Sequence, residues 1–268
     1  MRKKRFCHLG FLLTVATRVL FCPHGALAQE PDAEPQAHIV EPIITEETMP
    51  NEPGDYDLRL SGSYLWRDAT GSGSLPRAQL FFGIANRWGA EIEVPWAFAK
   101  QATEHYGVGD VSATLKYLAR KPGSRSPGIV LGLETAFPSG NVDKGLGEGV
   151  LEAAPFVALV QTSGRFVLQG NFGYSIVHLV RETDARNQFF YNSAIAFRLQ
   201  HIRSFLLGEI NGTRAATRSQ IAFSPGMKYN FTPQRYVALA LPIGLNSQTP
   251  RLGIVLQLQV TLRSAEPE

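Results

Sequence analysis

The sequence predicts an all-β protein, and within that class a transmembrane antiparallel up-and-down β-barrel of about twelve strands. Three observations predict it: the chain opens with an export signal, apolar and polar residues alternate through residues 56–264, and connections of alternating length separate the alternating segments. Successive side chains of a strand point to opposite faces, so alternation gives each strand one apolar and one polar face. In an outer-membrane barrel the apolar face contacts lipid and the polar face lines the interior.

Residues 1–28 have the features of a secretory signal peptide. They begin with the basic run MRKKRF, continue with an apolar stretch and end on a small-x-small site at Ala26 and Ala28. We expect cleavage after Ala28. Both cysteines, Cys7 and Cys22, lie in this segment, so the mature chain is expected to have neither disulfides nor thiolate chemistry.

Residues 29–55 form an acidic, proline-rich N-terminal segment that we predict to be flexible. It holds eight acidic residues, five prolines and no lysine or arginine. Such a composition buries too little apolar surface to offset the entropy lost on ordering. Its only apolar patch is HIVEPII, residues 38–44, which could dock elsewhere. The rest of the chain has no dense lysine or arginine run, so we expect no nucleic-acid partner.

Twelve alternating segments follow residue 55, with lengths that suit tilted membrane-spanning strands. They are 56–67, 76–86, 88–99, 108–119, 127–137, 150–161, 165–179, 188–200, 203–212, 219–231, 234–244 and 251–263. No helical period of useful length competes with them. An even number of strands places both termini of the chain on the periplasmic side of the membrane.

The alternation is clearest in five of these segments. In chain order they contain WGAEIEVPWAF at 88–98, DVSATLKY at 110–117, RFVLQGNFGYSI at 165–176, QIAFSPGMKYNF at 220–231 and LGIVLQLQVTL at 252–262. In each, apolar residues recur at every second place, and mostly polar or small residues lie between them. The segments at 150–161, 188–200, 203–212 and 234–244 are less regular.

Two features favour lipid around the apolar faces. Aromatic residues such as Trp88, Phe98 and Tyr174 often lie near the ends of the apolar rows, as in the interfacial girdles of membrane barrels. Short connections also alternate with longer ones that are rich in glycine, serine and charge. The longer ones are 66–76, 100–109, 138–149, 181–188, 211–219 and 245–251. A soluble periplasmic β-sandwich shares this composition and is the alternative fold.

Four glycine-containing stretches carry a family resemblance. They are AEIEVPWAF at 90–98, GVGDVSATLKYLAR at 107–120, GLETAFPSGN at 132–141 and GLGEGVLEAAPFVAL at 145–159. In this order they resemble the outer-membrane β-barrel family named after the meta-pathway of phenol degradation, often labelled a transporter family. The resemblance covers roughly residues 56–262, and it implies a barrel in the outer membrane of a diderm bacterium. The last strand departs from many barrels, because VTLRSAEPE lacks the terminal aromatic residue that the barrel insertion machinery recognises.

The inward rows predict a polar lumen. The candidate lumen-lining and selectivity residues are Glu91, Glu93, Asp110, Lys116, Glu134, Arg165, Gln169, Lys228 and Gln257. Two roles are open for them. They could form a structural salt-bridge network that fills the lumen, in which each buried ion needs a partner, or a hydrated pathway whose mixed charges set selectivity.

A glycine-rich loop motif is predicted at Gly107, Gly109, Gly145 and Gly147. The first two glycines allow a sharp turn before Asp110, whose carboxylate can accept hydrogen bonds from loop amides. The other two could belong to a loop that folds inward and narrows a pore. No GK[ST] motif follows them, so no nucleotide site is expected.

Nothing in the sequence predicts catalysis or a cofactor. The histidines at 38, 105, 178 and 201 have no metal-ligand spacing. His178 has no serine beside it on its own strand face, as a phospholipase-type barrel enzyme would need. We therefore expect no enzyme, no catalytic residue, no metal site and no cofactor.

The predicted function is an outer-membrane β-barrel channel for passive uptake of small solutes, with aromatic or hydrophobic compounds as the candidate class. The expected partners are outer-membrane lipid, the small-molecule solute and the barrel insertion machinery. The alternative function is a structural or adhesive outer-membrane barrel without transport.

Overall fold

A computed structural model describes residues 43–44, 49–67, 70–100, 104–179, 186–199 and 203–263. All of them belong to one compact unit, His38–Glu268. The predicted signal peptide at 1–28 and most of the acidic segment at 29–55 lie outside the described residues, so their boundaries stay predictions.

Fourteen strands and one short 3-10 helix make up the regular structure of the described residues. They are β1 (Asp55–Arg67), β2 (Thr70–Ala85), β3 (Trp88–Lys100), β4 (Glu104–Val108), β5 (Val111–Arg120), β6 (Gly128–Phe137), η1 (Val142–Lys144), β7 (Val150–Ser163), β8 (Phe166–Leu179), β9 (Gln188–Arg198), β10 (Ser204–Arg214), β11 (Ser219–Thr232), β12 (Arg235–Ala240), β13 (Ile243–Gly244) and β14 (Leu252–Arg263). Within this part of the chain, no helix is long and apolar enough to span a membrane.

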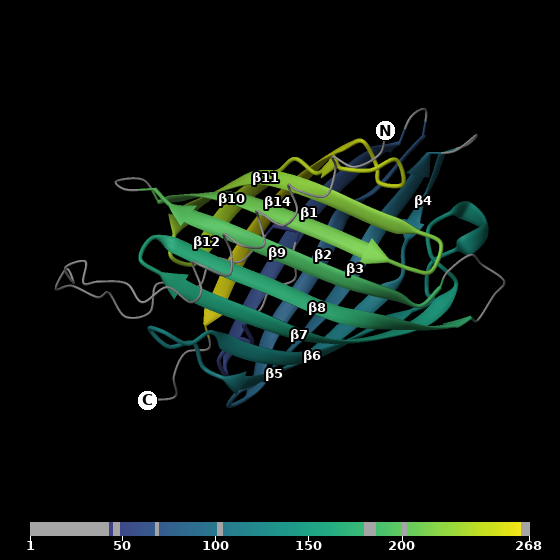
Figure 1. Ribbon diagram of the computed structural model, residues 1–268. Coiled ribbons are helices and arrows are strands. Elements are labelled where there is room, and N and C mark those ends of the chain that lie inside the picture. The colour runs from purple at the N-terminus through teal and green to yellow at the C-terminus, as the bar shows by residue number, and fades with distance from the viewer. Residues whose placement is uncertain are drawn as a thin grey trace, which may run out of the picture. The chain divides into compact units, whose positions relative to one another are not determined.

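Neighbouring strands pair antiparallel around a closed barrel (Figure 1). β1 and β14 close it, from the Asp55–Arg263 pair to the Trp66–Leu252 pair. We call the end with the first of these pairs the terminal rim and the opposite end the loop rim. β4 and β5 share β3 as a partner, and β12 and β13 share β11 and β14, so each of these two couples fills one strand position. The predicted twelve-stranded up-and-down barrel is confirmed.

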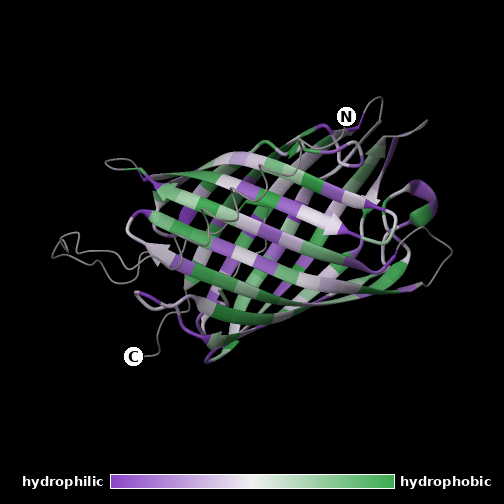
Figure 2. Ribbon diagram, in the orientation of Figure 1, coloured by the Kyte–Doolittle hydropathy of each residue, from purple (hydrophilic) through white to green (hydrophobic). Residues whose placement is uncertain are grey.

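The apolar rows face outwards. On β14, Leu256 is 54% exposed, whereas the next residue, Gln257, is 4% exposed. Figure 2 shows the same alternation as green bands separated by pale and purple bands along the strands. A soluble sandwich would bury its apolar rows, so the alternative fold is excluded. A closed barrel with an apolar outer surface needs lipid as its surroundings.

Pairs of aromatic rings lie near both rims. Near the terminal rim, the ring centres of Trp88 and Tyr117 are 4.8 Å apart. Near the loop rim, those of Tyr174 and Phe189 are 4.7 Å apart. Aromatic bands at both ends of the apolar surface are typical of membrane barrels, because these rings suit the lipid–water interface.

Two predicted long connections, 66–76 and 100–109, are wrong, because β2 and β4 occupy most of them. Gly73 explains the first error. It pairs with Tyr64 on one side and Phe98 on the other, and these two rings stack with centres 5.4 Å apart. A Cβ at Gly73 would lie 2.0 Å from a main-chain oxygen of β1. This glycine therefore permits close packing inside the sheet and does not mark a loop.

Candidate functional site in the barrel lumen

A network of charged side chains covers the inner face of β2, β3 and β5. The Lys116 ammonium lies 3.1 Å from Glu91 Oε2, and both side chains are almost fully buried. The Gln79 amide donates to Glu91 at 2.9 Å and to Glu93 at 3.0 Å. Arg77 Nε lies 3.3 Å from Glu93 Oε1, an ion-pair contact without hydrogen-bond geometry. The structure thus brings the predicted residues Glu91, Glu93 and Lys116 together.

A second inner network joins β1, β2, β11, β12 and β14. Arg59 Nε donates to Gln259 Oε1 at 2.7 Å, and the Tyr236 hydroxyl donates to the same oxygen at 2.9 Å. The Lys228 ammonium lies 3.5 Å from the Tyr236 ring centre, and the Arg59 guanidinium lies 4.3 Å from that of Phe81. Aromatic faces attract cations electrostatically. The predicted residue Lys228 is therefore inside the barrel, held against a ring.

An uncharged polar row lines the wall formed by β8, β9 and β10. Asn192 donates to Asn171 at 2.6 Å, and Asn211 donates to Asn192 at 3.0 Å. The predicted residue Gln169 is buried on the same face of β8, two positions before Asn171. This wall offers hydrogen-bond donors and acceptors without a net charge.

Among the residues that the structure describes, carboxylates outnumber cations inside the barrel. Glu152 on β7 accepts a hydrogen bond from the Ser175 hydroxyl at 2.6 Å, and the predicted residue Glu134 lies partly buried on the inner face of β6. Between the rims, the inward charged residues that the structure describes are Asp57, Arg59, Arg77, Glu91, Glu93, Lys116, Glu134, Glu152, Glu209 and Lys228. The lumen is therefore acidic on balance.

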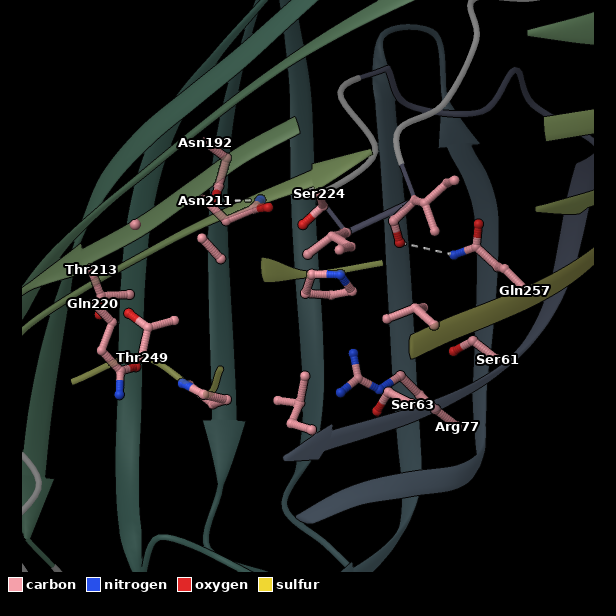
Figure 3. Close-up of a pocket in the computed structure, with 18 of the residues that line it drawn as sticks. Ser61, Ser63, Arg77, Asn192, Asn211, Thr213, Gln220, Ser224, Thr249 and Gln257 are labelled. Atoms are coloured by element: carbon pink, nitrogen blue, oxygen red, sulfur yellow. Dashed lines mark hydrogen bonds between the residues drawn. The ribbon is translucent and has the colours of Figure 1, made fainter. Parts of the chain in front are cut away.

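A cavity of about 340 Å³, which we call the chamber, occupies the part of the lumen towards the loop rim (Figure 3). It extends to Thr213 and Gln220, which lie beside the connection between β10 and β11. Its polar lining is Arg59, Ser61, Ser63, Arg77, Gln79, Glu91, Glu93, Asn192, Asn211, Thr213, Gln220, Ser224, Thr249 and Gln257. Its apolar lining includes Leu65, Ile221, Pro242 and Val255.

The floor of the chamber is formed by Ile43 and Ile44, two residues of the predicted N-terminal segment. The Ile43 N–H donates to Glu209 Oε1 at 2.7 Å, and the Ile44 N–H donates to Oε2 at 3.0 Å and to Oε1 at 3.3 Å. The Gln257 amide donates to the Ile43 carbonyl at 3.4 Å, the contact drawn beside Gln257 in Figure 3. Glu209 itself is fully buried. These two residues of the apolar patch 38–44 are thus docked inside the lumen.

Two predicted lumen residues lie elsewhere. Arg165 is exposed in the two-residue turn between β7 and β8 at the terminal rim, so its predicted lumen position is wrong. Asp110 lies between β4 and β5 and is absent from the chamber lining. Its carboxylate accepts hydrogen bonds from the Gly140 N–H at 2.8 Å and the Glu148 N–H at 2.7 Å. Asp110 therefore fastens the long connection between β6 and β7, which agrees with its predicted bonds to loop amides.

The four glycines of the predicted loop motif lie in two different parts of the structure. Gly107 lies within β4, so its assignment to a loop is wrong, and Gly109 follows at the break before β5. Gly145 ends η1 with a φ of 67°, and a Cβ at Gly147 would lie 2.6 Å from Asp110 Oδ1. The described residues contain no group of three or more His, Cys, Asp or Glu side chains that could hold a metal ion.

Comparisons with known proteins agree with this architecture. Residues 49–262 match the family model described as "Putative MetA-pathway of phenol degradation". The solved COG4313 outer membrane channel from Pseudomonas putida F1 is 11% identical, with a TM-score of 0.56 over 86% of this chain and 100% of that one. The KdgM porin is 11% identical, with a TM-score of 0.54 over 78% of this chain and 99% of that one. A comparison with curated proteins found no match.

A third solved structure, the NanC porin, is 12% identical, with a TM-score of 0.50 over 78% of this chain and 100% of that one. Identities this low show a shared barrel fold. The family model, in contrast, covers most of the chain and extends from before β1 to Leu262, the residue before the end of β14. Together with the closed barrel and its apolar outer surface, this match shows that the chain belongs to the phenol-degradation MetA-pathway family of outer-membrane β-barrels.

Proposed function

We propose that this protein is a channel, and not an enzyme, through which small solutes cross the outer membrane passively by way of the chamber. The observation that carries the proposal is the chamber itself, a cavity of about 340 Å³ inside a closed barrel, with polar and apolar walls. Such a volume lies within the range of small-molecule sites. A barrel that only stiffened the membrane would have no need of this space.

The two kinds of wall favour small amphipathic solutes. The asparagine row and the charged network offer hydrogen bonds to hydroxyl or carboxyl groups. Leu65, Ile221 and Val255 offer an apolar surface that an aromatic ring or a short hydrocarbon can cover. Hydroxylated aromatic compounds carry both features, and the family's description agrees with that class.

The acidic balance of the lumen favours cations over anions. Fixed carboxylates raise the local concentration of cations in a narrow water-filled path. Glu91 and Glu93 border the chamber directly, so they are the carboxylates that we expect to set this preference.

A structural barrel without transport is the second candidate. The ion pair between Lys116 and Glu91 favours it, because both side chains are almost fully buried and act as a strut between β3 and β5. The two roles differ in what they require. A structural role requires only the ion pair between Lys116 and Glu91, whereas a transport role also requires water and ions next to it.

Single-channel recording separates the two candidates. The mature protein, residues 29–268, would be refolded and inserted into a planar bilayer under a salt gradient. We expect discrete conductance steps with a reversal potential on the cation-preferring side, and reversible block by a small dihydroxybenzene. The structural barrel would be favoured if the well-folded protein never conducts and if variants in which Ile43 and Ile44 are released from Glu209 do not conduct either.

A further inference from the structure

The connections between strands at the terminal rim carry arginine. Each of them, counted with the strand residues next to it, has an exposed arginine, namely Arg87, Arg125, Arg165, Arg203 and Arg235 in chain order. The acidic residues that the structure describes at this rim are Glu52 and Asp55, just before and at the start of β1. At the loop rim, in contrast, the connection between β6 and β7 carries charges of both signs. In the described part of the chain, the terminal rim is therefore positively charged.

Aromatic side chains place these arginines at the depth of the lipid headgroups. Phe166 and Phe197 lie on the lipid-facing rows of β8 and β9, with ring centres 5.0 Å apart, and are adjacent in sequence to Arg165 and Arg198. Aromatic rings of membrane barrels gather at the boundary between hydrocarbon and headgroups. An arginine next to such a ring can extend its guanidinium into the headgroup layer while its methylene groups stay against the apolar surface.

The best-defined pair of these arginines flanks the end of β11, which lies between β10 and β12 (Figure 1). On the β10 side, Arg203 Nη1 donates to the Phe231 carbonyl at 3.0 Å. On the other side, Arg235 is the first residue of β12 and pairs with Thr232 of β11 and Val260 of β14. Val260 belongs to the lipid-facing row of β14, and directly paired residues share a face. Arg235 therefore lies at the end of a lipid-facing row.

An aromatic surface separates the two arginines. Phe231 is 50% exposed on the outer face, and its ring packs edge-on against that of Tyr229, with centres 5.1 Å apart. The strands that flank β11 are about 10 Å apart, so both arginine side chains can reach one anionic group in front of Phe231. Neither arginine has an ion-pair partner among the described residues. Guanidinium groups form paired, charge-assisted hydrogen bonds with phosphate.

We propose that Arg203 and Arg235, with Tyr229 and Phe231 between them, form a binding site for the phosphate headgroup of an anionic phospholipid. The acyl chains lie along the outer surface of β11, against the two rings. The other arginines of the terminal rim add a longer-range attraction that favours anionic over zwitterionic headgroups. The predicted periplasmic position of both termini places this rim in the leaflet that consists of phospholipids. The site depends on the barrel and not on conduction, so it goes beyond the proposed channel function.

A pair of double variants tests the site. Arg203→Gln with Arg235→Gln removes both charges at exposed positions. Lys144→Gln with Arg218→Gln is the matched control, because it removes two exposed cations from connections at the loop rim. Arg203→Lys with Arg235→Lys keeps the charges and shows whether a loss of binding comes from charge. Heat-modifiable gel migration verifies that each barrel is folded.

The readout is native mass spectrometry of the detergent-solubilised mature protein, titrated with dioleoyl phosphatidylglycerol or with dioleoyl phosphatidylcholine. We expect the wild type to bind the anionic lipid more tightly than the zwitterionic one. The double glutamine variant should bind phosphatidylglycerol about tenfold more weakly, because each cation near an anionic headgroup adds to the affinity. The loop-rim control should bind it as the wild type does, and the double lysine variant should recover most of the affinity.

Three results would overturn the proposal. Equal binding of the two lipids by the wild type would show that the rim has no preference for an anionic headgroup. Unchanged phosphatidylglycerol binding in the double glutamine variant would exclude these arginines from the lipid site and leave an acidic protein as their partner. An equal loss in the loop-rim control would assign the effect to total charge, and no recovery in the lysine variant would assign it to an altered rim structure.

Discussion

Replacing Leu256 with arginine puts a charge on the lipid-facing side of β14, near the middle of the strand. Leu256 is 54% exposed on the outer surface and pairs with Gly62 of β1 and Leu239 of β12. An arginine near the bilayer midplane destabilises a membrane barrel by about 2–4 kcal/mol. We expect the free energy of unfolding of Leu256→Arg to fall by that amount.

Gln257→Arg is the matched control, because it makes the same substitution one residue later on the inner face. The substitution removes two long hydrogen bonds of the Gln257 side chain. Its amide oxygen accepts one from the Tyr236 hydroxyl at 3.3 Å, and its N–H₂ group donates the other to the Ile43 carbonyl at 3.4 Å. Losing them should cost about 1 kcal/mol, since the new guanidinium can extend into the chamber that Gln257 lines.

Urea unfolding in lipid vesicles, followed by tryptophan fluorescence, measures both variants. Trp66, Trp88 and Trp96 are all exposed on the outer surface, so their emission reports the loss of lipid contact directly. The reasoning is refuted if Gln257→Arg unfolds at a lower urea concentration than Leu256→Arg, because the inner and outer faces would then be exchanged.

Three further predictions concern the charged residues. The double variant Glu91→Gln with Glu93→Gln should shift the reversal potential across a salt gradient to a value that indicates a greater preference for anions. An unchanged reversal potential in a variant that still conducts would show that neither glutamate borders the pathway. Lys116→Met should lower the free energy of unfolding by about 3–5 kcal/mol, because it leaves Glu91 buried without its cation; adding Glu91→Gln should recover most of that loss in the same urea titration. Asp110→Asn should weaken the two bonds that hold the connection 138–149, so that limited proteolysis of the folded barrel cuts it faster, and an unchanged cleavage rate would contradict this role.

The barrel and the orientation of its faces could be predicted because alternation with a period of two is a direct consequence of strand geometry. The aromatic residues at the ends of the apolar rows indicated which face of the barrel contacts lipid. The same reasoning found Glu91, Glu93 and Lys116, since their strands alternate regularly and register then places them side by side.

The errors arise where local composition and tertiary context disagree. The glycine and serine residues at 70–76 predicted a loop. In the structure, however, a glycine is needed at position 73 because aromatic rings from both neighbouring strands stack over it. Arg165 fitted the inward row of residues 165–179, yet the tight turn after β7 places it before the first residue of β8. The residue at which a strand begins decides whether a nearby side chain lies in the lumen or at the rim. Alternation alone does not determine where the strand begins.

Glu209 was missed for a different reason. It lies on segment 203–212, whose alternation is irregular, and its partners Ile43 and Ile44 are more than 160 positions earlier in the chain. The available signal was a single carboxylate between Leu207 and Asn211 on one strand face, together with one apolar patch in an acidic segment. No local pattern connects two such features, since only the closed barrel brings them together.

The most direct test of the account is the reactivity of single cysteines with a membrane-impermeant maleimide in intact cells. Both native cysteines precede residue 29, so the mature chain would carry only the introduced thiol. Ser63→Cys, in the chamber lining, should react from the outside, whereas Leu256→Cys, in the lipid-facing row, should stay unlabelled. Labelling of Leu256→Cys with protection of Ser63→Cys would contradict a water-accessible chamber inside a lipid-embedded barrel.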